Sequence, residues 1–138
     1  EEWERAARGD QGATYPWGED APGCTRAHVE RGPVFNACKG VGGLPDRSVE
    51  TGTYPEGASP YGLLDTAGNV EEWVDYRQDR ATLPLEDEVG MTRGSSYLEG
   101  EWMVDIAFSD TTLGPSITTP GHGFRCVMDP TLGTQEAD

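Results

Sequence analysis

The sequence lacks long apolar runs and has few positive charges, and both absences exclude classes of function. Among its 138 residues, 10 are Lys or Arg and 25 are Asp or Glu, which gives a formal net charge of −15. A surface of this charge repels phosphate backbones and anionic lipids, so we expect no nucleic-acid or membrane-surface binding. It favours cations and basic partners, although plain solubility also explains it. No apolar run reaches the roughly 18 residues of a membrane-spanning helix, so no span is predicted.

Regular periodicity is also scarce. The 19 glycines and 10 prolines interrupt a chain that is only 35% hydrophobic, and residues 10–58 show almost no period. This length allows one domain at most. A helix end is predicted over residues 1–8, because Trp3 shares a face with Ala6 or Ala7 and Gly9 is a stop signal. Short strands are predicted at 49–54, 91–97, 103–108 and 123–128, a strand or turn at 72–76, a surface loop at 77–90 and a polar tail at 131–138.

The densest pattern in the chain runs from Ser59 to Trp73. It places Gly68-Asn69, a turn signal in which both residues tolerate positive φ, among apolar and aromatic side chains. The polar groups that remain are oxygen donors: Asp65, Asn69, Glu71 and Glu72. Carboxylates spaced around a tight turn suit Ca²⁺, which takes carboxylate and backbone carbonyl oxygens together. The alternative is an irregular loop that aromatic side chains hold in a core.

This stretch resembles the signature of the formylglycine-generating enzyme family, also called the sulfatase-modifying factor family, roughly aromatic-Gly-Leu-x-Asp/Asn-x-x-Gly-Asn-Val-Trp-Glu-Trp. Further stretches agree with the family in the same order at Glu2–Gly9, Tyr15–Gly18 and Gly123–Cys126. The resemblance implies an α+β, C-type-lectin-like fold that is rich in loops and binds calcium. It also implies that residues 1–130 form a partial domain, and that the first half of the family domain lies outside this chain.

The resemblance supplies a calcium ligand set. It consists of the side chains of Asp65 and Glu72 and the backbone carbonyls of Gly68 and Val70. Glu71 stands where the family has tryptophan, so we expect this carboxylate to face solvent, a basic partner or the ion. For a second calcium site of the family, the nearest candidates are His28-Val29 and Asp46, although histidine is a poor calcium ligand.

Copper chemistry is not expected. Enzymes of this family oxidise a substrate cysteine with copper(I) held by two cysteines, whose aligned positions here are near Glu99 and Val104. No cysteine lies between Cys38 and Cys126, and soft Cu(I) needs thiolate or thioether ligands. An iron-dependent branch of the fold uses three histidines. This chain has only two histidines, and we interpret His122 as a loop residue, so no catalytic residue is predicted.

The three cysteines bear on the compartment. A disulfide between Cys24 and Cys38 would close a loop of about 15 residues and contribute roughly 3 kcal/mol. Bacterial relatives of the family often carry a cysteine pair in this region, which favours pairing in an oxidising compartment. The alternative is two buried thiols in a cytosolic protein. Cys126 is expected to be buried in the last strand, and the odd count leaves open a bridge to a cysteine outside the chain.

Taken together, these features predict a non-catalytic, calcium-stabilised, extracytoplasmic binding or assembly domain. Its partner would be another protein or the remaining half of the domain, contacted by a face that includes Trp3. Trp102, Tyr97 and Phe108 are expected in the core rather than on a sugar platform. One alternative is an oxidoreductase that uses another metal or residues from the missing half. Another is a glycan- or peptide-binding lectin-like module, which would need an open coordination position on the calcium.

Overall fold

A computed structural model describes residues 1–29, 47–75, 90–111, 117 and 119–128. The chain begins with helix α1, Glu2–Arg8, close to the predicted bounds. Acidic residues lie in its first turn and basic residues in its last, which suits the helix dipole. Gly9, at φ 69°, ends the helix and donates its N–H to the carbonyl of Arg5. The local signals in the sequence therefore sufficed to place this element.

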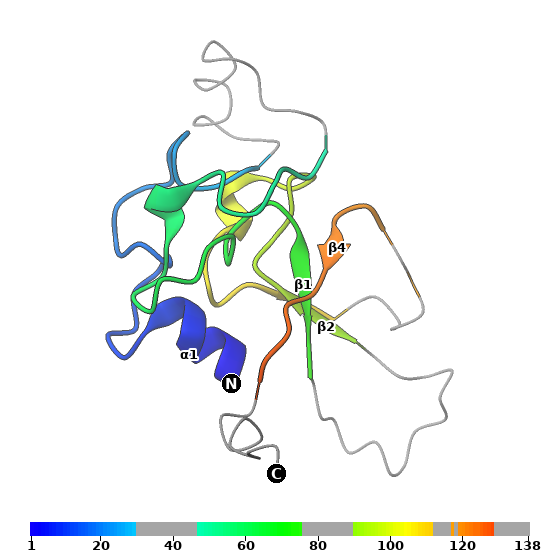
Figure 1. The fold of residues 1–138 in the computed structure, drawn as a ribbon, viewed down its shortest axis with the longest axis horizontal. Coiled ribbons are helices and arrows are strands. Elements are labelled where there is room, and N and C mark those ends of the chain that lie inside the picture. The colour runs from blue at the N-terminus through cyan, green and yellow to red at the C-terminus, as the bar shows by residue number, and fades with distance from the viewer. Residues whose placement is uncertain (30–46, 76–89, 112–116, 118, 129–138) are drawn as a thin grey trace, which may run out of the picture.

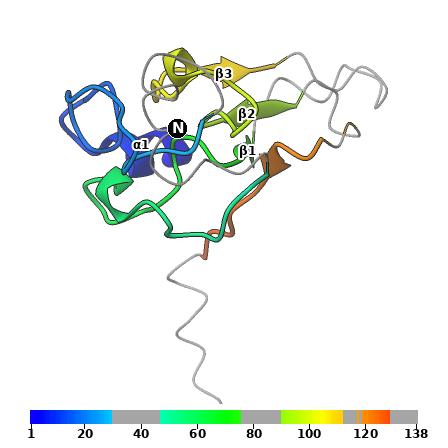
Figure 2. The same cartoon turned by 90° about the horizontal axis from the view of Figure 1, so that it is seen from above.

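The strands form one small sheet with the order β3-β2-β1-β4. Its members are β1 (Glu71–Val74), β2 (Met91–Arg93), β3 (Ser109–Asp110) and β4 (His122–Gly123). β1 pairs antiparallel with β2 and parallel with β4, which places Glu71 opposite His122. Figures 1 and 2 show α1 beside β1 and β2, and the 3.3 Å ion pair of Glu4 with Arg93 joins helix and sheet.

Strand β2 is shorter than predicted because the backbone turns directly after it. Gly94 and Ser95 have φ of 94° and 53°, which takes both out of the β region. Beyond this turn, the N–H of Tyr97 bonds to the carbonyl of Asn69. The segment 94–97 therefore packs against the Gly68-Asn69 turn instead of extending the strand.

Two predicted strands are absent from the described residues. In place of a strand at 49–54, a turn forms in which Gly52 has φ 85° and Thr53 donates to the carbonyl of Glu50. A short 3₁₀ helix, Pro55–Gly57, follows. In place of a strand at 103–108, another 3₁₀ helix, Glu101–Met103, leads through a turn to β3. Val104 and Ile106 are nevertheless fully buried, so the alternating apolar pattern reports burial within irregular backbone.

A cluster of buried apolar residues lies under the loops rather than on the sheet. It contains Ala27, Val29, Ala67 and Val104, with Tyr15 and Trp17 packed against it and stacked on each other at 5.3 Å. Of the three aromatic residues expected in the core, Tyr97 is buried and Phe108 is half-buried. Trp102 was predicted wrongly, because its side chain is 63% exposed and lies over Gly100 at the surface.

The C-terminal segment also differs from its prediction. The closing strand is limited to His122–Gly123, and residues 124–128 continue as irregular chain. Cys126 is an exposed free thiol rather than a buried residue. Cys38, most of the 77–90 loop and the 131–138 tail lie outside the described residues. In the part of the chain that is described, no helix has the length and apolar character to cross a membrane.

Candidate functional site

The predicted calcium loop is a turn in which three residues adopt left-handed backbone. Asp65, Gly68 and Asn69 have φ of 58°, 77° and 67°. The Asn69 side chain accepts a hydrogen bond from the N–H of Val49 at 2.9 Å and donates one to its carbonyl at 3.3 Å. Gly68 lies against the backbone of His28, where an added Cβ would be 2.5 Å from the His28 carbonyl oxygen. Only glycine fits there.

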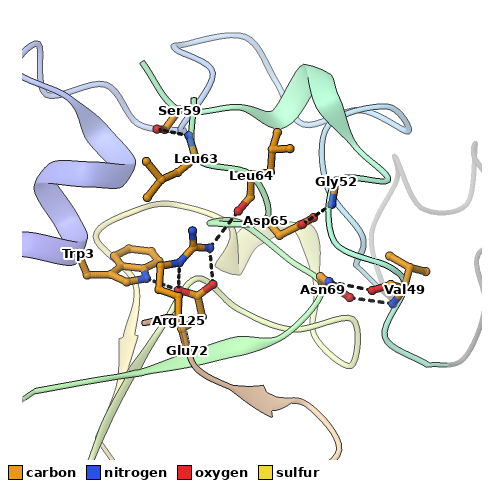
Figure 3. Close-up of polar contacts among 10 residues, drawn as sticks. All are labelled: Trp3, Val49, Gly52, Ser59, Leu63, Leu64, Asp65, Asn69, Glu72 and Arg125. Carbon is orange, nitrogen blue, oxygen red and sulfur yellow. Dashed lines mark hydrogen bonds and ion pairs between the residues drawn. The ribbon is translucent and has the colours of Figure 1, made fainter. Parts of the chain in front are cut away.

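The carboxylate of Asp65 is directed into the loop that precedes it. Its Oδ2 accepts a hydrogen bond of 2.8 Å from the N–H of Gly52. Figure 3 shows the Asp65 side chain turned toward Gly52 and away from Glu72. The two predicted carboxylate ligands therefore do not converge on one point in this arrangement.

Glu72 is engaged by groups from both ends of the chain. The Nε of Arg125 donates to Oε2 at 2.6 Å, and its second guanidinium nitrogen donates to Oε1 at 2.5 Å. The indole N–H of Trp3 donates to Oε2 at 2.6 Å, as Figure 3 shows. Arg125 also donates to the carbonyl of Leu64 at 2.9 Å. The buried charge of Glu72 is thus paired, and the half-buried Trp3 contributes one of its hydrogen bonds, while a partner face that includes Trp3 stays a prediction.

These contacts define how well the loop suits calcium. Both oxygens of Glu72 already accept hydrogen bonds from protein donors, and its charge is balanced by Arg125. Among the described residues, no group of three or more His, Cys, Asp or Glu side chains is arranged to hold a metal ion. Calcium binding by the side chains of Asp65 and Glu72 with the carbonyls of Gly68 and Val70 therefore stays a prediction. Binding would require Asp65 to turn and Glu72 to share its carboxylate with Arg125.

Glu71 lies on the opposite face of β1 from Glu72 and is also buried, with 3% of its surface exposed. The hydroxyl of Thr92 donates a short hydrogen bond to its Oε2, and Nε2 of His122 lies 3.8 Å from the same oxygen. Burial, followed by the neighbouring carboxylate of Glu99, raises the pKa of Glu71 to about 7. Glu71 therefore faces neither solvent nor the predicted ion.

The two positions aligned with the copper cysteines lie close to this buried acid or in the core. Glu99 accepts a 2.6 Å hydrogen bond from the N–H of Ser96 and sits beside Glu71. Val104 is part of the apolar cluster. A carboxylate and an aliphatic side chain cannot replace two thiolates around Cu(I). What the arrangement can do is retain a proton on Glu71 at pH values where an exposed glutamate has already lost it, because burial raises the pKa of Glu71.

His122 is the residue whose place the sequence did not reveal. It was interpreted as a loop residue, but it lies in β4, is largely buried, and packs edge-on against Trp73 at 5.2 Å. Its Nδ1 has no hydrogen-bond partner among the described residues. The sequence held one indication that a polar residue packs near Glu71: this acid replaces the family's tryptophan, and a buried acid needs polar neighbours.

The second calcium candidate stays a prediction, because the structure describes only part of it. The ring of His28 is buried and stacks on Tyr54 at 6.0 Å and on Tyr97 at 5.8 Å. Val29 belongs to the apolar cluster, and Asp46 lies outside the described residues. The pairing of Cys24 with Cys38 stays a prediction, because Cys38 is also outside them.

Comparison with known families agrees with these features. The chain matches the sulfatase-modifying factor enzyme 1-like domain over residues 1–130. The chain therefore belongs to the formylglycine-generating enzyme, or sulfatase-modifying factor, family. It has a small mixed sheet and few helices, built around the Gly68-Asn69 turn. The resemblance of the Ser59–Trp73 motif is confirmed by this match.

Its relatives include proteins named as enzymes and proteins named as inactive. The formylglycine-generating enzyme of Mycobacterium tuberculosis is 42% identical over 96% of this chain and 50% of its own length. That of Thermomonospora curvata is 34% identical over 94% of this chain and 48% of its length. The inactive C-alpha-formylglycine-generating enzyme 2 of Bos taurus is 32% identical over 91% of this chain and 41% of its length. The chain thus spans about half the length of the curated relatives it matches.

Proposed function

We propose that this chain is a non-catalytic binding or assembly domain of the formylglycine-generating enzyme family. The observation that carries the proposal is the replacement of the copper ligands. Glu99 and Val104 stand where two cysteines are expected, and the sequence has no cysteine between Cys38 and Cys126. The name of the Bos taurus relative, an inactive member of the family, supports a role without catalysis.

The finer features of the proposal rest on the family. We infer a C-type-lectin-like fold, an extracytoplasmic location, and calcium bound weakly at Asp65, Gly68, Val70 and Glu72. The ion would stiffen the turn by adding oxygen contacts, and it would supply no chemistry. Because Arg125 already balances the charge of Glu72, the affinity should lie at the weak end of protein calcium sites, with a Kd of about 10⁻³ M.

Binding is supported by the exposed side chains of the 95–103 loop. Leu98 and Trp102 are exposed, while Ser95 and Ser96 anchor the loop in the interior. A fixed base with exposed apolar tips is a common form of recognition loop. The partner would be another protein, or the remaining part of the domain.

The test is a paired measurement of copper binding and peptide oxidation. The purified chain is titrated with Cu(I) against a competing chelator. It is also incubated with a cysteine-containing substrate peptide of the Mycobacterium tuberculosis relative, and that relative itself serves as the positive control. We expect no formylglycine product and no stoichiometric Cu(I) binding. The Cys126→Ser variant separates adventitious copper on the exposed thiol. Product formation by this chain would establish the oxidoreductase alternative instead.

A further inference from the structure

Trp102 presents one face of its indole ring to solvent. Its side chain is 63% exposed, although the sequence predicted it in the core. A Cβ added to Gly100 would lie 2.3, 2.4 and 2.4 Å from three neighbouring atoms of the six-membered ring. Because these distances are nearly equal, the flat face of the ring, rather than its edge, lies on the Gly100 backbone. One face of the ring is therefore covered by glycine, and the opposite face is open.

The loop that carries this ring is held in place from within the fold. Residues 95–97 are buried before the ring, and Val104 is buried after it. Trp102 lies in the 3₁₀ helix Glu101–Met103, whose last residue donates its N–H to the carbonyl of Gly100 at 2.9 Å. Figure 2 shows this helix, in yellow, beside β3 at the margin of the molecule. The ring is thus an exposed group on a well-supported backbone.

The charged residues that flank the ring in the sequence are all acidic. Gly100 stands between Glu99 and Glu101, and neighbouring Cα atoms are about 3.8 Å apart, so both glutamates adjoin the backbone on which the ring lies. Residues 94–124 contain four acidic residues and no lysine or arginine. A negative potential beside an open tryptophan face favours a cation over an anionic or neutral group.

We propose that the open face of Trp102 binds a cationic side chain, lysine or arginine, of a protein partner. This inference rests on the proposed binding function of the 95–103 loop and names the chemistry of its contact. A cation over an aromatic face is attracted by the negative charge of the π system, and tryptophan is the aromatic residue that binds cations best. The flanking glutamates and the net charge of −15 add attraction at longer range.

The same features argue against other occupants of the ring. An acidic glycan or a nucleic acid would bring negative charge to a surface that is already acidic, and a second copy of the chain carries the same net charge of −15. A neutral sugar would also stack on the ring, but it would take no share of the electrostatic attraction. A basic protein surface combines both terms, and the attraction would also speed its association.

The experiment follows the probe peptide acetyl-Gly-Arg-Gly-amide by NMR in the presence of the full 138-residue chain. A side chain stacked on an indole face experiences the ring current, so the arginine δ-methylene resonance should move upfield in a saturable way. We expect a Kd of roughly 10 mM, as for one exposed contact. The peptide with lysine should also bind. The peptide with citrulline, which keeps the shape of arginine and lacks its charge, should shift at least about 3-fold less.

Three variants locate the contact. Trp102→Leu keeps an apolar side chain but removes the ring, so the upfield shift should be lost. Gly100→Ala keeps the ring but places a methyl group where the ring lies, and the φ of −84° at this position suits alanine. In a variant whose circular dichroism matches the parent, the shift should fall at least about 3-fold. Tyr61→Leu is the matched control, because Tyr61 is an exposed aromatic residue elsewhere and its loss should leave the shift unchanged.

Several outcomes overturn the inference. Absence of a shift at about 50 mM peptide, a concentration that still detects weak association, removes the cation as the occupant. Equal shifts with Trp102→Leu and the parent chain remove the surface, and equal shifts for the arginine and citrulline peptides remove the role of charge. Movement of the Trp102 indole N–H resonance with cellobiose but not with the arginine peptide assigns the ring to a neutral sugar. A chain that neither binds Cu(I) nor shifts the peptide leaves the proposed lack of catalysis intact and overturns only the cation contact.

Discussion

At the residue scale, Arg125 is the group that makes a buried Glu72 possible. Arg125→Leu leaves the Glu72 carboxylate, which is 6% exposed, without its counter-charge. We expect a loss of about 3 kcal/mol of unfolding free energy, the low end for breaking a buried pair. Urea denaturation measures it. Arg5→Leu is the control, because Arg5 and its partner Asp10 are both largely exposed and should contribute nothing measurable.

The same pair allows charge to be separated from packing. If the cost of Arg125→Leu is the unpaired carboxylate, then the Glu72→Met/Arg125→Leu double variant should recover most of the lost stability. If the cost is lost packing of the arginine stem, the double variant should be no more stable than the single one. A double-mutant cycle in urea distinguishes the two.

Glu71 should give the protein an unusual pH dependence. Its pKa is raised from 4.5 to about 7, so between these values the unfolded chain releases a proton that the folded chain retains. The contribution of Glu71 to the free energy of unfolding is therefore fully present below about pH 4.5 and is lost as pH rises through 7, by about 3 kcal/mol at most. Glu71→Gln should remove this slope. The measurement is the difference between parent and variant in calcium-free buffer across pH 4.5–8, and identical slopes would contradict the assignment.

At the element scale, the sequence predicted what local signals determine. α1 ends at a glycine and β1 begins where the Gly68-Asn69 turn ends, and both lie close to their predicted places. The strands expected at 49–54 and 103–108 do not form, because the backbone makes local turn hydrogen bonds within those segments, as from Thr53 to Glu50. An alternating pattern of apolar residues records which side chains are buried, and it does not record the backbone that buries them.

The candidate site was predicted only in part, for a related reason. The sequence predicted a site at Asp65, Gly68, Val70 and Glu72 because they lie close together in one motif. It did not identify their partners, since the contacts of Glu72 with Trp3 and Arg125 join residues 69 and 53 positions apart. Such pairings depend on the register of the sheet, which one sequence without a tertiary fold does not specify.

The turn itself can be tested with two glycines that share a backbone conformation. Gly62 and Gly68 have φ of 79° and 77°, but an added Cβ meets nothing within 4 Å at Gly62, whereas at Gly68 it meets the His28 carbonyl. Gly62→Ala should cost about 1–2 kcal/mol from strain alone. Gly68→Ala should cost at least about 2 kcal/mol more, because the turn must also move away from His28. Thermal unfolding of both variants gives the difference, and equal costs would mean that the close approach contributes nothing.

At the scale of the whole molecule, the 65–72 loop joins segments that are distant in the sequence. Figure 3 shows Trp3 from α1, Gly52 and Val49 from the preceding loop and Arg125 from the C-terminal segment meeting around it. The contacts of this loop thus hold distant segments together in a fold with little regular structure. Anything that binds the folded loop and not the unfolded chain raises the stability of the entire domain by mass action.

Calcium is the ligand with which to test whether binding at this loop stabilises the domain. With a Kd of about 10⁻³ M, 1 mM calcium adds about 0.4 kcal/mol and 10 mM about 1.4 kcal/mol, a rise in Tm of a few degrees. The high negative charge complicates the measurement, because any cation that screens a net charge of −15 also stabilises the folded state. Magnesium and matched ionic strength in NaCl therefore set the baseline, and the rise in Tm with calcium should exceed the rise with either.

The Asp65→Asn variant tests whether the effect comes from this loop. Asparagine keeps an oxygen for the Gly52 N–H and tolerates positive φ, so the calcium-free Tm should change little while the rise in Tm with calcium falls by half or more. Equal shifts for calcium and magnesium, or an unchanged shift in Asp65→Asn, would mean that screening is the whole effect and that Arg125 alone supplies the positive charge at this loop.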